Sequence, residues 1–176
     1  MILFGTRCVF YEPLLSGVIR IEEVREVKQT MGTTTAEQNK ELARRDVDEI
    51  WNAGQFDLVD ELYSDDFVHH DPAYPGEIRG PDGQKEFVET YTTAFPGDPN
   101  ISIDELLSED EFVVLRWTGR GTHEGAFVGI EPTHEPIEVM GMTMARVENG
   151  TFAEMWSQYD ALGLLNQIGA IDSPSP

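Results

Sequence analysis

The chain has 176 residues, of which 40% are hydrophobic and 10% are aromatic. This length is typical of one domain with its own core, and the apolar content is too high for a disordered chain. The formal net charge is −21. A surface of that charge repels nucleic acid and anionic membranes, so we expect neither as a partner.

The acidic excess begins after the first 30 residues. Residues 1–30 carry four acidic and four basic side chains, and beyond them the lysines are Lys40 and Lys85. An acidic excess serves solubility in ordinary proteins. With so few lysines we interpret it as adaptation to high salt, because molar salt shortens the Debye length to about 3 Å and screens self-repulsion.

Cysteine content and hydropathy indicate a cytoplasmic protein. Cys8 is the single cysteine of the chain, so no internal disulfide is expected and the compartment is expected to be reducing. No apolar run reaches 18 residues, and charged residues interrupt the N-terminal stretch where a signal peptide would be apolar.

Charge and hydropathy divide the chain into three parts. Residues 1–30 match nothing downstream, and two interpretations are open: an upstream misread start, or an added edge strand or helix. Residues 31–172 form the single expected domain. Residues 173–176 are a Ser-Pro tail.

Helical signals dominate the chain before residue 97. Thr35 and Gln38 fit a capping box, and apolar residues then recur at helical spacing until Gly54. A second, short helix is predicted over 58–63. A third is predicted over 81–95, with a proline in its first turn.

After residue 100 the apolar period changes from helical spacing to two. This alternation predicts strands within 101–103, 112–117, 137–147 and 152–159. Helices that precede strands in the chain are typical of an α+β fold. We therefore expect three N-terminal helices to cover one face of a curled antiparallel sheet.

The turn at Asn149-Gly150 decides which residues of the last two strands share a face. A two-residue turn would pair Glu148 with Thr151, whereas a three-residue loop would pair Val147 with Thr151. We expect the three-residue loop, because it sets the small residues of the penultimate strand on the same face of the sheet as Ser157 and leaves a hollow there. The two-residue turn would set the bulky methionines on that face instead. That hollow is the predicted pocket, lined by His69, Trp117, Gly141, Thr143, Met155, Ser157 and Tyr159.

A methionine stripe lies on the opposite face of the same strand. It consists of Met140, Met142 and Met144, and Trp156 is expected beside it. Bulky apolar residues at this spacing belong either to the core or to a subunit interface.

Several short motifs, each weak by itself, follow one another in an informative order. They are Trp51-Asn52-Ala53-Gly54, Asp66-Phe67-Val68, His70-Asp71-Pro72, Ala94-Phe95-Pro96, Arg116-Trp117, Gly121-Thr122-His123-Glu124-Gly125 and Leu162-Gly163-Leu164-Leu165. On these residues the chain resembles the SnoaL-like polyketide cyclase (ester cyclase) group of the nuclear-transport-factor-two-like superfamily, over roughly residues 39–169. The resemblance implies a cone-shaped α+β barrel, usually dimeric, with a deep apolar cavity and no metal or organic cofactor.

The resemblance also implies a chemistry, intramolecular aldol condensation. In the family an aspartate on the last strand is the general acid/base and a histidine on the preceding strand assists it. Aligned on Asp160 and Gly163, the aspartate falls at Ser157 and the histidine at Thr143. A serine hydroxyl is a poor general base at neutral pH, so a neighbouring group would have to substitute.

Two segments offer such a group. His123 ends a glycine-rich strand, and is either a proton donor at the pocket mouth or a structural histidine bound to turn carbonyls. His69 and His70 lie on an extended segment and point opposite ways, so one of them, with Asp71, is expected to face the cavity; for the same reason no metal site is expected. The candidate catalytic residues are therefore His123, His70 and Asp71. Asp160 is expected to be a structural cap.

The expected function is binding of a small cyclic or polyketide-like carbonyl compound in an apolar cavity. The protein would be a cofactor-independent acid/base cyclase or isomerase, and a homodimer. Two alternatives remain open: a non-catalytic small-molecule binding protein, and a hydrolase or isomerase of another substrate.

The charge pattern generates the first testable prediction. The folded state should lose stability when salt is removed, because repulsion between carboxylates is then unscreened. The melting temperature should therefore fall between molar and dilute KCl. An unchanged melting temperature would contradict adaptation to high salt.

Overall fold

The computed structural model describes residues 35–97 and 100–171. All of these residues belong to one compact unit of the chain, within Gly32–Pro176. The predictions for residues 1–30 and for the tail 173–176 lie outside the described residues.

The predicted helices are present, and one more follows the last strand. The Thr35 hydroxyl accepts from the Gln38 amide and the Gln38 side chain accepts from the Thr35 amide, which confirms the capping box. The first helix ends before Gly54, as predicted. The helical segments are α2 (Ala36–Arg45), its π-helical continuation η1 (Asp46–Asn52), the 3-10 turn η2 (Phe56–Leu58), α3 (Val59–Leu62), α4 (Gly80–Ala94) and α5 (Ala161–Gln167).

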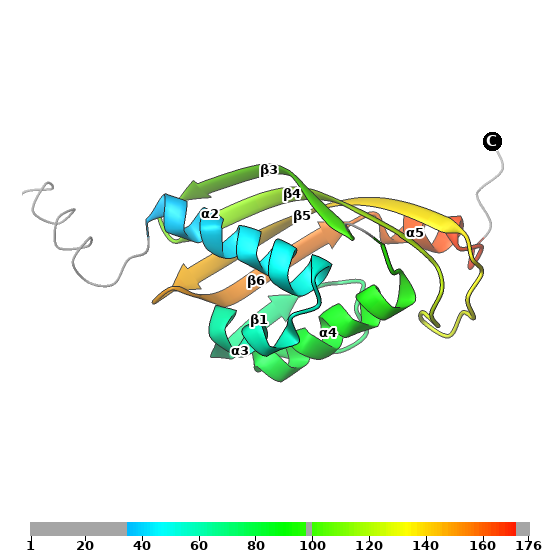
Figure 1. The fold of residues 1–176 in the computed structure, drawn as a ribbon, viewed down its shortest axis with the longest axis horizontal. Helices are drawn as coiled ribbons and strands as arrows, with labels where there is room; N and C mark the ends of the chain where they lie inside the picture. The colour runs from blue at the N-terminus through cyan, green and yellow to red at the C-terminus, as the bar shows by residue number, and fades with distance from the viewer. Residues whose placement is uncertain (1–34, 98–99, 172–176) are drawn as a thin grey trace, which may run out of the picture. The chain divides into compact units, whose positions relative to one another are not determined.

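The described strands form one six-stranded sheet, and the fold is α+β as predicted (Figure 1). The sheet order is β2-β1-β6-β5-β4-β3, and the sheet is not closed into a barrel. The strands are β1 (Tyr63–His70), β2 (Ile78–Arg79), β3 (Ile101–Glu109), β4 (Phe112–Thr122), β5 (Pro136–Glu148) and β6 (Thr151–Tyr159).

Two features of the sheet differ from the prediction. β1 and β2 precede α4, so helices and strands are not fully segregated along the chain. The sheet is also mixed rather than antiparallel, because β1 pairs with β6 in parallel, with His69 opposite Met155 and His70 opposite Trp156. A parallel partner far away in sequence leaves no local turn signal, which is why alternation within residues 63–70 alone did not reveal this strand.

The turn between β5 and β6 also differs from the prediction. Asn149 and Gly150 both have positive φ, at 52° and 90°, and form a two-residue turn that pairs Glu148 with Thr151. The predicted three-residue loop is therefore wrong. A β-bulge then inserts Ala153 as an extra residue in β6, and this restores the predicted face, now with Thr143 directly opposite Ser157.

Helices α2 and α4 lie against the same side of the sheet (Figure 1). Side chains from η1 and α4 reach the inward face of β4, β5 and β6, where they and the strands line one cavity. Two apolar clusters lie around this space. One includes Phe67, Phe87 and Phe152, and the other includes Phe95 and Ile168. Both clusters contribute to the cavity wall, through Phe87 and Phe95.

The methionine stripe faces away from the cavity. Met140, Met142 and Met144 are 60%, 53% and 39% exposed, so they are not part of the core of the described domain. The subunit-interface interpretation stays a prediction.

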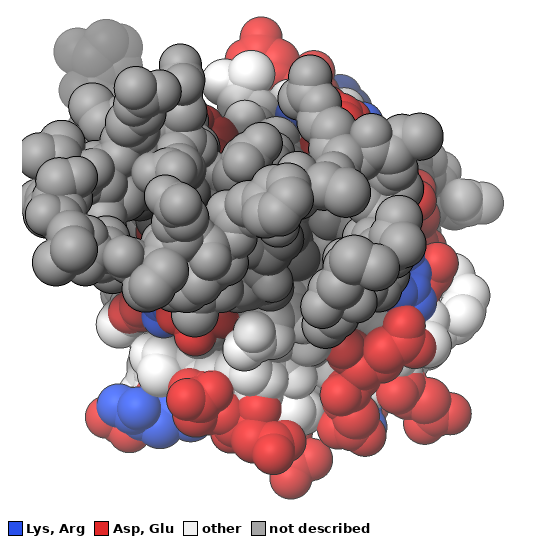
Figure 2. Space-filling model, turned by 90° about the vertical axis from the view of Figure 1, so that its left-hand side faces the viewer, with Lys and Arg blue, Asp and Glu red and all other residues white. Residues whose placement is uncertain are grey.

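Figure 2 shows the end of the domain at which β3 and β5 terminate, where red Asp and Glu side chains outnumber blue Lys and Arg among the described residues in view.

Candidate functional site

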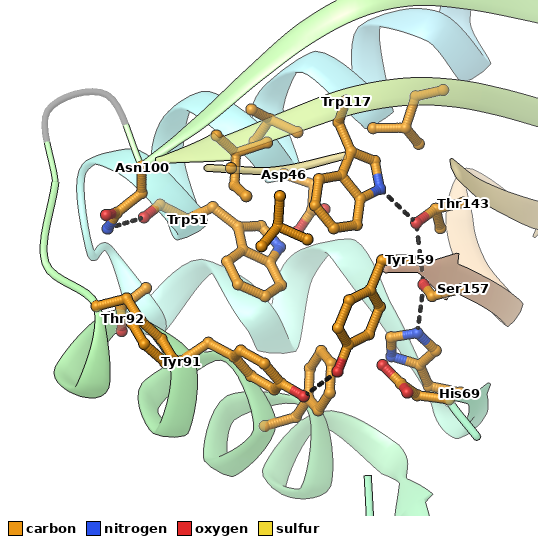
Figure 3. A pocket seen from close by; sticks show the side chains of 18 of the residues that line it. Asp46, Trp51, His69, Tyr91, Thr92, Asn100, Trp117, Thr143, Ser157 and Tyr159 are labelled. Carbon is orange, nitrogen blue, oxygen red and sulfur yellow. Dashed lines mark hydrogen bonds between the residues drawn. The ribbon is translucent and has the colours of Figure 1, made fainter. Parts of the chain in front are cut away.

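A mainly apolar cavity lies between the sheet and the segments η1 and α4 (Figure 3). Its volume is about 110 Å³. An engineered apolar cavity of roughly 150 Å³ holds benzene, so this space is on the scale of a small ligand. The π-helical winding of η1 brings three of its residues into the wall. The lining includes Asp46, Val47, Trp51, His69, Asp71, Gln84, Tyr91, Trp117, Thr143, Met155, Ser157 and Tyr159.

Four polar side chains form a chain of hydrogen bonds along the cavity wall (Figure 3). The Trp117 indole N–H donates to Thr143 Oγ1 at 3.1 Å, and Thr143 Oγ1 lies 2.9 Å from Ser157 Oγ. Ser157 Oγ in turn lies 2.8 Å from His69 Nε2. The chain runs across β4, β5 and β6 to β1, and it depends on the pairing of all four strands.

The other ring nitrogen of His69 fixes the direction of these bonds. Nδ1 lies 3.1 Å from Gln84 Oε1, which only accepts, so the proton of the neutral ring is on Nδ1. Nε2 is then an acceptor and Ser157 donates to it. Thr143 consequently donates to Ser157, and the three hydrogen bonds from Trp117 to His69 all point toward His69.

The amide of Gln84 is held in its orientation by a buried pair. Gln84 Nε2 donates to the Tyr63 hydroxyl at 3.2 Å, and that hydroxyl donates to Asp46 Oδ1 at 2.6 Å. Gln84 is 1% exposed and Tyr63 is 2% exposed, so neither exchanges freely with water. The polar chain therefore continues behind His69 and ends on a carboxylate.

Burial sets the protonation of His69 and Asp46, two titratable groups of this hydrogen-bonded network. Desolvation lowers the pKa of His69 to about 4, against a smaller opposing effect of its hydrogen bond to Gln84, so the ring is neutral at neutral pH. Desolvation also raises the pKa of Asp46 to about 7, and the Tyr63 hydrogen bond opposes this. A neutral base and a carboxyl that titrates near neutrality thus belong to one hydrogen-bonded unit.

A second polar group lines the same cavity. The Tyr91 and Tyr159 hydroxyls lie 2.7 Å apart, and Asp71 Oδ1 accepts from the Ala73 amide at 2.9 Å. Burial raises the pKa of the Asp71 carboxyl, and burial raises that of Tyr159 to about 12. The Asp71 charge contributes to the raised pKa of both tyrosines.

Comparison with known proteins identifies the family. The family model for SnoaL-like polyketide cyclase matches residues 41–168. The chain belongs to this family. A comparison with curated proteins found no match.

Solved structures of similar fold agree with this membership. TsrD from Streptomyces laurentii is 25% identical with a TM-score of 0.69, over 78% of this chain and 99% of that one. IdmH from Streptomyces antibioticus, described as a candidate polyketide cyclase, is 26% identical with a TM-score of 0.62, over 75% and 99%. A candidate SnoaL-like polyketide cyclase from Jannaschia sp. CCS1 is 24% identical with a TM-score of 0.68, over 77% and 94%, and shows the fold alone.

Most predicted pocket residues of this SnoaL-like protein lie in the cavity wall. His69, Trp117, Thr143, Met155, Ser157 and Tyr159 line it, and so does the catalytic candidate Asp71. Gly141 lies beneath the Trp117 indole, where an added Cβ would overlap the ring. It therefore shapes the wall without lining the space.

The other two catalytic candidates lie elsewhere. His70 points to the outer face, where its Nε2 is 2.9 Å from Glu154 Oε1 and its ring stacks on Trp156. His123 is fully buried and stacks on Phe95, outside the residues that line the cavity. Its Nδ1 accepts from the Thr133 amide at 3.2 Å, as a structural histidine bound to a turn would. Asp160 caps α5 by accepting from the Gly163 amide, as expected.

Asp46, Gln84 and Tyr63 are the site residues that the sequence did not reveal. Asp46 and Gln84 are polar residues within helical segments that otherwise present apolar residues inward. A buried polar residue on an apolar helical face is the signal that could have found them, since such groups need a partner.

Among the described residues, no cluster of three His, Cys, Asp or Glu side chains is placed to hold a metal ion, and no helix is long and apolar enough to cross a membrane.

The contact between Gly141 and Trp117 generates a prediction for the wall. Gly141→Ala should push the indole off its position and weaken its bond to Thr143, at a cost of about 1–3 kcal/mol in the free energy of unfolding. Urea denaturation measures this cost. In a Trp117→Phe background, which lacks the overlapping ring atoms, the same change should cost distinctly less. Equal costs in both backgrounds would contradict the contact.

The raised pKa of Asp46 generates a prediction for stability. Its pKa is 3.8 in the unfolded chain and about 7 in the folded protein, so the folded state binds the proton more tightly. This contribution to stability is fully present below pH 4. Between pH 4 and 7 the unfolded carboxyl ionises while the folded one stays protonated, so the contribution is lost as the pH rises through 7. Asp46→Asn removes this loss. The variant should gain stability relative to the native protein between pH 4 and 7, at up to about 1.4 kcal/mol per pH unit, and level off above. Denaturation of both proteins across this range measures the difference; a difference independent of pH would contradict the burial of a titrating carboxyl.

Proposed function

We propose that this protein is a cofactor-independent acid/base enzyme, a cyclase or isomerase that moves a proton on a small cyclic or polyketide-like carbonyl compound. The single observation that carries the proposal is the 2.8 Å contact between His69 Nε2 and Ser157 Oγ in the cavity wall. Ser157 stands where the family resemblance expects an acid/base aspartate. His69 supplies beside it the base that a serine lacks.

The proposed proton path uses two atoms of the wall. Ser157 gives its hydroxyl proton to His69 Nε2 while its oxygen takes a proton from the carbon next to the ligand carbonyl. Thr143 donates to the serine oxygen, and so stabilises negative charge that develops there. The reverse transfer returns a proton to another atom of the same ligand, which leaves both residues as they began.

The lowered pKa of His69 suits a reaction of this kind. Its base form is present at all pH values above about 4. A base that holds its proton weakly returns it readily, which an isomerisation or ring closure requires because no net proton is consumed. The apolar remainder of the wall disfavours water, which would otherwise compete for the proton.

The test is exchange of α-protons, because it requires proton abstraction without knowledge of the natural substrate. We expect the protein to accelerate deuterium uptake by β-tetralone in D₂O, followed by proton NMR in molar KCl. His69→Gln and Ser157→Ala should each reduce the acceleration roughly 10²- to 10⁴-fold, the range typical of general acid–base catalysis.

The neighbouring histidine provides the matched control. His70→Gln removes an imidazole one position away on the exposed face, and should leave exchange unchanged. The exchange rate should fall as the pH drops through about 4, where His69 gains its proton. Absence of acceleration by the native protein would contradict the proposal and favour a non-catalytic binding protein on the same fold.

A further inference from the structure

The second polar group of the cavity, formed by Asp71, Tyr91 and Tyr159, has no part in the proposed proton path. It shares the cavity with Ser157, but its hydrogen bonds to described residues do not join the chain through His69. Its bonding capacity is incomplete in two respects, one at Asp71 Oδ2 and one at the tyrosine hydroxyls.

Asp71 has a buried oxygen without a partner. The residue is 9% exposed, and its Oδ1 accepts from the Ala73 amide. Its Oδ2 is buried and has no hydrogen-bond partner among the described residues. A carboxylate oxygen left unpaired away from water costs free energy, so this atom is an acceptor in need of a donor.

One of the two tyrosine hydroxyls is a hydrogen-bond donor without an acceptor among the described residues. Their hydroxyls are 2.7 Å apart, so one donates to the other and the second keeps a proton that no described residue accepts. The proton stays on the ring oxygen, since burial raises the pKa of Tyr159 to about 12 and that of Tyr91 further. The Asp71 charge acts on both rings, so the spare donor and the spare acceptor are electrostatic neighbours.

We propose that Asp71 and the Tyr91–Tyr159 pair form a subsite for a hydroxyl group of the ligand. The ligand hydroxyl donates to Asp71 Oδ2 and accepts from the free tyrosine proton. This inference rests on the proposed function and narrows its substrate class to a hydroxylated cyclic ketone, with the ring in the apolar part of the cavity and the carbonyl toward Ser157.

The pairing of one donor with one acceptor favours a group that both donates and accepts, such as a hydroxyl, over a carbonyl or an ammonium group. A second carbonyl would satisfy the tyrosine but leave Asp71 Oδ2 unpaired. An ammonium group would satisfy Asp71 but present a further donor to the tyrosine proton. Only a group that both donates and accepts completes the subsite.

The test compares three probes that differ at one position: acetophenone, para-hydroxyacetophenone and para-methoxyacetophenone. Binding to the native protein in molar KCl is measured by calorimetry or ligand-observed NMR. The hydroxy probe should bind about tenfold more tightly than acetophenone, the gain expected for one hydrogen bond to a charged group. The methoxy probe, which accepts but cannot donate, should show no such gain.

Asp71→Asn tests the acceptor. It keeps the size of the side chain and an oxygen for the Ala73 amide, but replaces Oδ2 by a donor, so the preference for the hydroxy probe should fall to within about twofold. Asp60→Asn, on the exposed side of α3, is the matched control and should keep the preference. If Asp71→Asn does not fold, the comparison of hydroxy and methoxy probes on the native protein decides.

Several outcomes would overturn the subsite. These are equal affinity of the native protein for the three probes, no binding of the hydroxy probe at millimolar concentration, or a preference that survives Asp71→Asn. The assay measures binding and needs no turnover. His69→Gln should therefore abolish proton exchange and leave the hydroxyl preference intact, which separates failure of the subsite from failure of the proposed activity.

Discussion

The candidate site depends on the parallel pairing of β1 with β6, because this pairing sets His69 beside Ser157. The two strands are far apart in the chain, so only the tertiary fold brings the two side chains together. Burying an imidazole in a low-dielectric cavity is unfavourable unless both nitrogens are paired. Gln84 and Ser157 provide the two partners, and each of them is held by a further buried group. The result is a polar network in which the direction of each hydrogen bond is determined by the next.

The local parts of this fold follow from the sequence, and the long-range parts do not. A capping box and apolar periodicity predict α2 and α4, because their causes lie within a few residues. The turn at Asn149-Gly150 is one residue shorter than predicted, yet Thr143 and Ser157 still share one face of the sheet. The reason is the bulge at Ala153, which shifts the register by one residue and compensates for the shorter turn. Such compensation has no signal in the residues themselves.

The site shows the same division at the level of single residues. Alternation along an extended segment establishes that His69 and His70 face opposite ways, but it cannot decide which one faces inward. The neighbouring strand and helix α4 make that decision. A glycine-rich motif made His123 conspicuous, although that histidine is buried against a turn outside the cavity. Asp46 and Gln84 come from different helical segments, so their relation to His69 exists only in three dimensions.

On the proposed mechanism, the exchange of a carboxylate base for a histidine changes the electrostatics of the reaction. A carboxylate becomes neutral as the ligand becomes an enolate, whereas a neutral histidine becomes a cation and an ion pair forms in a dry cavity. That pair needs stabilisation at both ends. Thr143 and Trp117 donate toward the anionic end through Ser157. At the opposite ring nitrogen the chain continues through two neutral groups to Asp46, whose negative charge above its pKa of about 7 favours the imidazolium without taking its proton. The length of the polar chain behind His69 is therefore what a neutral base requires and a carboxylate base would not.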